Sequence, residues 1–123
     1  MTAIDPAFLL LFVVDPAASA AFYERALGRP PLESSPTFVM FELAGGWRLG
    51  LWKRDGVQPP AASGAFGGEI GVPVAAADLQ PLSVALLAHG ARIAQPSVQA
   101  DFGPNFLALD PDGHRIRVFA PGG

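Results

Sequence analysis

Two short segments of this sequence combine arginine and aromatic residues with aliphatic residues that alternate with them. Residues 46–52 read GWRLGLW and residues 113–119 read GHRIRVF, so glycine, arginine, aliphatic and aromatic residues recur at a constant offset of 67. Because successive side chains of a β-strand point to opposite faces, the aliphatic residues of each segment would share one face. The other face would carry arginine and aromatic side chains, which bind carboxylates and stack on planar rings. This combination is unusual for a core and ordinary for a binding site.

The elements that would position these two segments are repeated as well. Residues 8–14 and 69–74 have the composition of strands, and each is followed by a helical segment that ends at a glycine and then by a short strand. Two copies of a β-α-β-β-β unit predict an α+β fold with two curved mixed sheets and a site between them. We expect a single domain over residues 1–123, with modules at 7–53 and 68–120 joined by a linker at 54–67.

Capping residues and apolar spacing define the two predicted helices. Asp15-Pro16 would start a helix over residues 17–27, and Asp78 would cap a second helix that ends at His89. The buried stripes would consist of Ala18, Phe22 and Ala26 in the first helix and of Leu79, Leu82 and Leu86 in the second. The first strand is continuously apolar, so we expect it to be covered on both faces. The other strands are predicted at residues 37–43, 47–53, 92–94, 98–99, 106–109 and 114–119, with a loop at 100–104.

The composition argues against several classes of function. Half of the residues are apolar and 15% are charged, which provides for a substantial core and for apolar surface that could meet a second subunit. The net charge of −3, without a cluster of Lys or Arg, argues against a nucleic-acid partner. The longest apolar run, residues 7–14, is far shorter than the roughly 20 residues of a membrane span. We therefore expect a cytoplasmic protein with no nucleic-acid or membrane partner. The absence of cysteine excludes disulfides.

Two motifs resemble those of a known superfamily. Residues 15–23 (DPAASAAFY) and 110–119 (DPDGHRIRVF), set in this order of elements, are similar to the vicinal-oxygen-chelate superfamily of glyoxalase I, bleomycin-resistance proteins and extradiol dioxygenases. The resemblance covers nearly the whole chain and implies a dimeric glyoxalase/bleomycin-resistance-like fold. Glu69-Ile70-Gly71, Asp101-Phe102-Gly103 and Trp52 more closely resemble phenazine-antibiotic resistance proteins, which bind their ligand without a metal. That likeness implies a homodimer that sequesters a planar aromatic drug between its subunits.

The same resemblance bears on metal binding. Enzymes of the superfamily place metal ligands, usually His, Gln or Glu, at four positions, which in this sequence fall on Phe8, Gly50, Glu69 and Arg117. Phenylalanine and glycine side chains offer no ligand atom, and arginine keeps its proton and its positive charge. A single carboxylate cannot hold a catalytic metal ion. We expect no metal, no other cofactor, and no metal-dependent glyoxalase or dioxygenase activity.

Strand alternation extends the candidate site on both sides of Arg117. If Arg117 faces the cavity, so do Arg115 and Phe119, and the offset of 67 places the first segment in the same way. The predicted ligand-binding residues are Trp52, Phe8, Leu10, Phe12, Gly50, Arg48, Glu69, Phe102, Phe106, Arg117 and Phe119. Phe38 and Met40 are further candidates whose strand face the sequence does not decide.

Each of these residues has a structural interpretation as well as a functional one. Trp52 would stack on the ligand or be buried in the core or a dimer interface, and Gly50 would leave the sheet open to a flat molecule. Glu69 and Arg117 would form a charge pair that either aims the guanidinium at a ligand carboxylate or is an ordinary salt bridge. Phe102 and Phe106 would close over the ligand from a flap, or plug the end of the sheet.

Three functions remain open on this sequence. The leading one is non-enzymatic binding and sequestration of a planar aromatic, phenazine-like antibiotic or metabolite, which confers resistance. The second is a metal-independent lyase, isomerase or drug-modifying enzyme with Glu69 as base and Arg117 stabilising an oxyanion. The third is a dimeric scaffold whose cavity is filled by Trp52 and Phe119. No catalytic residue is predicted for the leading function. The modules could pair within one chain or be exchanged between subunits.

Overall fold

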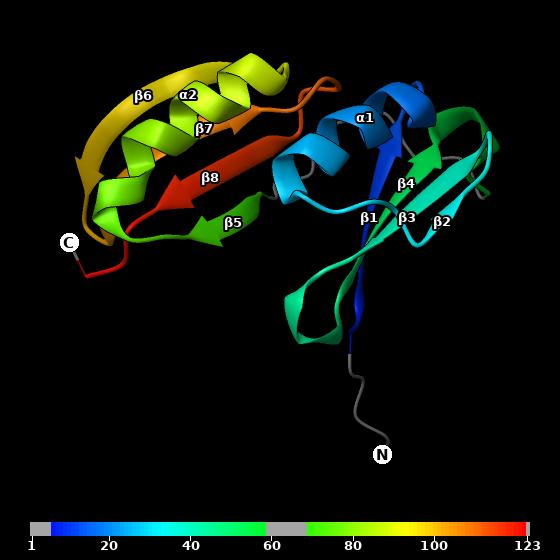
Figure 1. The fold of residues 1–123 in the computed structure, drawn as a ribbon, viewed down its shortest axis with the longest axis horizontal. Coiled ribbons are helices and arrows are strands. Elements are labelled where there is room, and N and C mark those ends of the chain that lie inside the picture. Colours follow the sequence, from blue (N-terminus) through cyan, green and yellow to red (C-terminus); the bar gives the residue numbers. More distant parts are fainter. Residues whose placement is uncertain (1–5, 59–68, 123) are drawn as a thin grey trace. The chain divides into compact units, whose positions relative to one another are not determined.

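The chain folds into two compact units, residues 1–63 and 64–123, each built around one sheet and one α-helix (Figure 1). The structure is a computed structural model that describes residues 6–58 and 69–122. Within these residues the fold is α+β, with two four-stranded mixed sheets and two α-helices. The predicted fold class is thereby confirmed.

The first unit follows the predicted β-α-β-β-β order. Its elements are β1 (Phe8–Val13), α1 (Pro16–Leu27), β2 (Glu33–Ser34), β3 (Phe38–Glu42), the 3-10 turn η1 (Ala44–Gly46), β4 (Arg48–Lys53) and the 3-10 turn η2 (Arg54–Gly56). The strand order in the sheet is β1-β4-β3-β2, with β1 parallel to β4 and the other pairs antiparallel. The predicted linker begins with η2, and its residues 59–67 lie outside the described residues.

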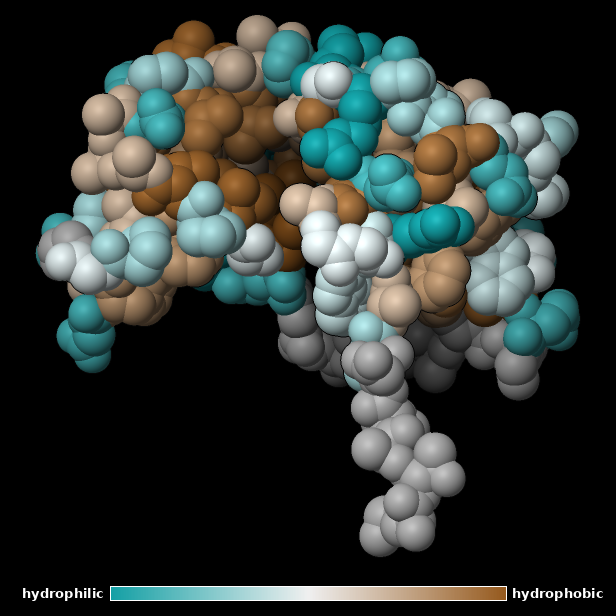
Figure 2. Space-filling view, turned by 60° about the horizontal axis from the view of Figure 1, so that its bottom comes forward, coloured by the Kyte–Doolittle hydropathy of each residue, from teal (hydrophilic) through white to brown (hydrophobic). Residues whose placement is uncertain are grey.

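The second unit repeats this topology. Its elements are β5 (Ile70–Pro73), the 3-10 turn η3 (Ala76–Asp78), α2 (Leu79–His89), β6 (Arg92–Ala100), β7 (Gly103–Leu109) and β8 (Arg115–Phe119). The strand order β5-β8-β7-β6 again has a parallel edge pair, β5 with β8, and two antiparallel pairs. In Figure 2, apolar side chains (brown) predominate over the visible part of this unit, on the left.

The helix ends explain where α1 begins and where both helices stop. The Asp15 Oδ1 atom accepts hydrogen bonds from the backbone N–H groups of Ala17 and Ala18, and Pro16 occupies the first helical turn. Gly28 and Gly90 terminate α1 and α2 with positive φ angles of 70° and 113°, which glycine adopts without strain. Asp78 stands at the start of α2, but its side chain makes no capping hydrogen bond because η3 precedes the helix.

The buried stripes of the helices differ in part from the prediction. In α1 the buried residues are Pro16, Ser19, Phe22 and Tyr23, whereas Ala18 is exposed and Ala26 is half-buried. The stripe is shifted towards the aromatic pair of Phe22 and Tyr23, which are 1% and 3% exposed and whose rings meet edge to face. In α2, Leu79 and Leu86 are buried as predicted and Leu82 is half-buried.

Alternation along β4 and β8 follows the prediction. Leu49 and Leu51 are 2% and 0% exposed, and Ile116 and Val118 are also buried, so these residues form the helix-facing core of each unit. The intervening residues, among them Arg117, are half-buried or more exposed, with the exception of Gly50. Within one chain, β1 is not covered on both faces as predicted, because Phe8 and Leu10 are 52% and 43% exposed.

The β6–β7 hairpin is longer than predicted. The two short strands expected at 92–94 and 98–99 are one strand, β6, with register irregularities between Ile93 and Gln95 and between Gln95 and Val98. β7 begins at Gly103, inside the segment predicted to be a loop. Pro96 interrupts the sequence pattern, but an edge strand tolerates a residue that has no N–H group, and β6 is an edge strand.

Candidate functional site

An apolar pocket of about 470 Å³ lies on the first sheet, on the face opposite α1. Phe8, Leu10, Phe38 and Trp52 line it. The strand register brings them together, because Leu10 lies beside Gly50 and Trp52 lies between Phe12 and Phe38 across three adjacent strands. The Trp52 ring also meets the Phe12 ring edge-on, with centroids 6.2 Å apart. Three of the predicted residues therefore share a pocket, and Phe38 joins them.

Gly50 makes room for two of the residues that line the pocket. A Cβ atom at this position would lie 2.6 Å from the Leu10 Cδ2 atom and 2.8 Å from the Phe38 Cζ atom, both far inside van der Waals contact. The expectation that Gly50 leaves the sheet bare for a flat molecule is therefore wrong. The side chains of Leu10 and Phe38 cover this glycine, and they form the surface that a ligand would meet.

Two other predicted residues of the first unit lie on the same sheet face outside the pocket. Arg48 is half-buried and pairs in register with Phe8 on one side and Glu42 on the other. Phe12 is half-buried and supports the edge of Trp52. Met40, whose face the sequence left open, is directly beside Gly50 and is 9% exposed.

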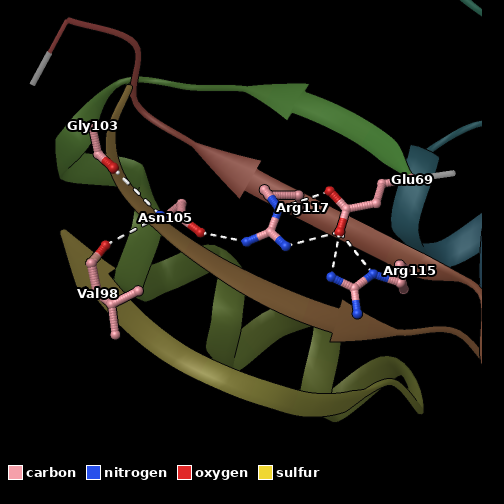
Figure 3. Close-up of polar contacts among 6 residues, drawn as sticks. All are labelled: Glu69, Val98, Gly103, Asn105, Arg115 and Arg117. Atoms are coloured by element: carbon pink, nitrogen blue, oxygen red, sulfur yellow. Dashed lines mark hydrogen bonds and ion pairs between the residues drawn. The ribbon is translucent and has the colours of Figure 1, made fainter. Parts of the chain in front are cut away.

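The second sheet carries a cluster of two arginines around one glutamate (Figure 3). Arg117 forms a bidentate pair with Glu69, with Nε to Oε1 and Nη2 to Oε2 distances of 2.8 Å each. Arg115 approaches the same carboxylate from the other side, with its Nε atom 2.7 Å and its Nη2 atom 2.6 Å from Oε2. The predicted charge pair is confirmed, and Arg115 is an additional member of it.

Asn105 orients Arg117 from β7. Its Oδ1 atom accepts a hydrogen bond of 2.7 Å from the Arg117 Nη1 atom, and its Nδ2 atom donates to the backbone oxygens of Val98 and Gly103. The Asn105 side chain is buried, at 1% exposure. No sequence pattern predicts this role for Asn105, and the only available signal is that it is the chain's single asparagine and lies within an apolar stretch.

The cluster shifts the pKa values of its members. Hydrogen bonds from Arg117 lower the pKa of Glu69 to about 2, with Arg115 adding to the effect and partial burial opposing it. The same pair raises the pKa of Arg117. Glu69 is therefore ionised at neutral pH, and a carboxylate with so low a pKa is a weak proton acceptor.

Two aromatic residues stand at the end of this sheet face, beside the cluster. Phe119 follows Arg117 by two positions on β8 and therefore points to the same side. Phe102, 47% exposed in the turn between β6 and β7, meets the Phe119 ring edge to face at a centroid distance of 5.9 Å. Phe106 is 1% exposed and pairs with Val118, so the prediction that it belongs to a flap is wrong: it is a core residue of the helix-facing side.

The residues at the four superfamily metal positions do not fit a divalent cation. Both oxygens of Glu69 accept hydrogen bonds from guanidinium groups, and Phe8, Gly50 and Arg117 provide no ligand atom. Among residues 6–58 and 69–122, no group of three or more His, Cys, Asp or Glu side chains could hold a metal ion.

The two histidines lie in the turn before β8 and at the end of α2. The His114 Nδ1 atom lies 2.8 Å from the Asp110 Oδ2 atom, while Asp110 Oδ1 accepts hydrogen bonds from the backbone of Asp112 and His114. These contacts stabilise the turn between β7 and β8. His89 ends α2. Within the described part of the chain, no helix has the length and apolarity needed to cross a membrane.

Comparison with known proteins identifies the family. Residues 5–118 match the Glyoxalase/Bleomycin resistance protein/Dioxygenase superfamily. The chain is 29% identical over 119 residues to the phenazine antibiotic resistance protein EhpR of Enterobacter agglomerans, covering 94% of this chain and 91% of that protein. It resembles the solution structure of protein ATC0852 from Agrobacterium tumefaciens, with a TM-score of 0.88, 42% identity, and coverage of 98% of this chain and 100% of the other. A glyoxalase-related enzyme from Fulvimarina pelagi gives a TM-score of 0.83 at 25% identity, with coverage of 94% and 87%. The chain belongs to the glyoxalase/bleomycin resistance protein/dioxygenase superfamily.

Proposed function

We propose that this protein binds a planar aromatic small molecule, a phenazine-like antibiotic or metabolite, and confers resistance by sequestering it unchanged. The observation that carries the proposal is the apolar pocket of about 470 Å³ formed by Phe8, Leu10, Phe38 and Trp52. Its volume lies within the range of small-molecule sites, and three of its four residues are aromatic. The 29% identity to a phenazine antibiotic resistance protein supports phenazine as the first ligand to test.

The affinity expected of such a pocket sets the condition for resistance. A ligand of roughly 20 non-hydrogen atoms that gains about 0.3 kcal/mol from each would bind with about 6 kcal/mol, a dissociation constant of tens of micromolar. Stacking on Trp52 would add about 0.5–1.5 kcal/mol beyond simple burial. Sequestration by mass action therefore requires protein in excess of the drug, or a fit better than this average.

The geometry of Glu69 argues against the enzymatic alternative. A general base works best with a pKa near the working pH, whereas hydrogen bonds from Arg117 and Arg115 hold the pKa of Glu69 at about 2. Arg117 is likewise engaged by Glu69 and Asn105.

We also propose that the protein is a homodimer. Phe8 and Leu10 lie on the edge strand β1 with about half of each side chain exposed, and they line the same pocket as Trp52. Exposed apolar residues that are contiguous on one sheet face are typical of a subunit interface or a ligand site. Burial of this face by a second copy would also enclose the ligand.

Titration of the protein with phenazine tests the proposed function. In a Trp47→Phe background, Trp52 is the remaining tryptophan, so stacking should quench its fluorescence as the ligand binds. Trp52→Ala should weaken binding about tenfold in calorimetry, which corresponds to about 1.4 kcal/mol. Trp47→Ala is the matched control, because Trp47 is 43% exposed and lies outside the pocket. Unchanged affinity in Trp52→Ala would refute the stacking role, and recovery of a chemically altered phenazine would replace sequestration by catalysis.

A further inference from the structure

The side chains that line the pocket of the first unit offer a ligand no strong hydrogen-bond acceptor. Phe8, Leu10 and Phe38 have no polar side-chain atom, and the indole Nε1 atom of Trp52 is a donor only. Met40 lies on the same sheet face, but its thioether accepts hydrogen bonds only weakly and the residue is 9% exposed. Among the residues that the structure describes, the pocket is therefore apolar with a single donor.

The backbone beneath the pocket provides no acceptor either. β4 lies between β1 and β3, so its carbonyl groups are used in the hydrogen bonds of the sheet, and these lie in the plane of the sheet while the pocket lies on its face. Leu10 and Phe38 also cover Gly50, because their nearest atoms lie 2.6 and 2.8 Å from the position that a Cβ atom would take. A ligand in the pocket thus meets side chains and not peptide groups.

Two carboxylates lie on this sheet face outside the pocket. Glu42 pairs in register with Arg48, which pairs with Phe8, so the backbones of Glu42 and Phe8 are about 10 Å apart, across two strand spacings. Glu33 pairs with Met40 from β2, on the side of β3 that faces away from β4. Neither glutamate lines the pocket. The acceptors of this face are therefore at its margin.

The two redox states of a phenazine differ in their need for an acceptor. Oxidised phenazine has two ring nitrogens that accept hydrogen bonds, and it has no donor. Uptake of two electrons and two protons gives 5,10-dihydrophenazine, in which each ring nitrogen carries an N–H group and the central ring is no longer aromatic. A buried N–H group without an acceptor loses its hydrogen bond to water and gains none in return. The oxidised ring system is also electron-poor, which favours stacking on the electron-rich face of an indole.

We propose that the pocket discriminates between the redox states of its ligand and binds oxidised phenazine more tightly than dihydrophenazine. The inference rests on the proposed function, because it concerns the same pocket and the same class of ligand. By linkage, tenfold tighter binding of the oxidised form makes the midpoint potential of this two-electron couple about 30 mV more negative. A reduced nicotinamide, which supplies a hydride while water supplies the second proton, would then reduce the bound ligand less completely than the free one.

Binding measurements on the wild-type protein test this inference directly. Anaerobic calorimetry with phenazine and with electrolytically reduced phenazine should show about tenfold tighter binding of the oxidised form. In a spectroelectrochemical titration, saturating protein should lower the midpoint potential of phenazine by about 30 mV. Equal affinities, or tighter binding of the reduced form, would overturn the inference.

Three leucine variants test whether the missing acceptor is the cause. Leu10→Gln brings an amide oxygen into the pocket, so the ratio of the two affinities should fall towards one. Leu10→Lys introduces only donors, so the ratio should not fall. Leu32→Gln makes the same change as Leu10→Gln at a residue that is 53% exposed and outside the pocket, and it should keep the wild-type ratio. An equal fall in Leu10→Gln and Leu10→Lys would overturn the role assigned to the acceptor.

The outcomes separate this inference from the proposed function. Phenazine that binds equally well in both redox states, with an affinity that depends on Trp52, would refute the redox preference and leave the proposed function standing. Failure of oxidised phenazine to bind would refute both. The wild-type titrations decide between these outcomes even if a Leu10 variant does not fold.

Discussion

Glu69 accepts hydrogen bonds from Arg115 and Arg117 of the neighbouring strand β8. Arg117 in turn donates a hydrogen bond to the side-chain oxygen of Asn105 on β7. Each contact in this series is charge-assisted, and such hydrogen bonds are stronger than those between neutral groups. Asn105 leaves no polar atom of its side chain unpaired, because its amide nitrogen binds the backbone of Val98 and Gly103. A single buried asparagine thus fixes where the positive charge of Arg117 lies.

The low pKa of Glu69 predicts how the stability of the protein depends on pH. Because the pKa falls from 4.5 to about 2 on folding, the ionised carboxylate stabilises the folded state above pH 4.5, and this stabilisation is lost as the pH falls towards 2. The contribution at neutral pH should be about 1 kcal/mol, since the carboxylate is partly in contact with water.

Urea unfolding of the wild type and of Glu69→Gln measures this contribution. The difference in unfolding free energy should be present at pH 7 and should vanish near pH 2. Glu24→Gln on the exposed side of α1 serves as control and should change little at either pH. A Glu69→Gln difference that persists at pH 2 would contradict the proposed ion-pair origin.

At the scale of elements, each sheet has one parallel pair of strands at its edge, β1 with β4 and β5 with β8. Each pair contains a glycine, which lies on the inner strand in the first sheet and on the edge strand in the second. In the first sheet the inner strand β4 contributes Gly50, and Leu10 from the edge strand β1 extends across it. In the second sheet the edge strand β5 contributes Gly71, next to Arg117 from the inner strand β8. The first arrangement covers the sheet with apolar side chains, and the second leaves an arginine free to reach Glu69.

These two glycines predict different responses to the same substitution. Gly50→Ala should lower the unfolding free energy by about 1–3 kcal/mol, because the new methyl group would overlap Leu10 and Phe38. Gly71→Ala is the matched control: its Cβ atom would lie 3.7 Å from the Phe119 ring, an ordinary contact, and stability should change little. Thermal unfolding of both variants makes the comparison, and a well-tolerated Gly50→Ala would show that the pocket side chains move aside without cost.

At the scale of the whole molecule, one topology is used twice with different surface chemistry. The sheet face opposite α1 is mainly apolar, with Phe8, Leu10 and Trp52, while the face opposite α2 carries the arginine cluster. The repeated units provide the same strand alternation, and the residues on the alternate positions differ. Two sheet faces of different chemistry therefore arise from one β-α-β-β-β design.

The proposed dimer predicts the mass of the protein in solution. Analytical ultracentrifugation should give twice the 12.8 kDa of one chain, since association would cover Phe8 and Leu10. Phe8→Asp should shift the equilibrium towards the monomer, because a charge would be buried in an apolar interface. Leu87→Asp on α2, where Leu87 is 58% exposed, is the control and should leave the mass unchanged. A wild-type protein that sediments as a monomer at all concentrations would refute the dimer.

The sequence predicted those features that depend on neighbouring residues. Strand alternation placed Leu49 and Leu51 in the core, and the repeat predicted both sheets. Both predictions depend on patterns among residues that are close together in the sequence. The role of Asn105 was missed because its partner, Arg117, is 12 residues away across a strand pair. Phe106 was misplaced because Gly103-Pro104 resembles a loop, although the structure extends β7 through it.

The strict division between helix-facing and outward-facing positions has a consequence for the evolution of this protein. Replacing Trp52 or Arg115 changes a side chain on one side of a strand and leaves Leu51 and Ile116, on the other side, in their places. Substitutions can therefore change the chemistry of the outward sheet face while the interior stays constant.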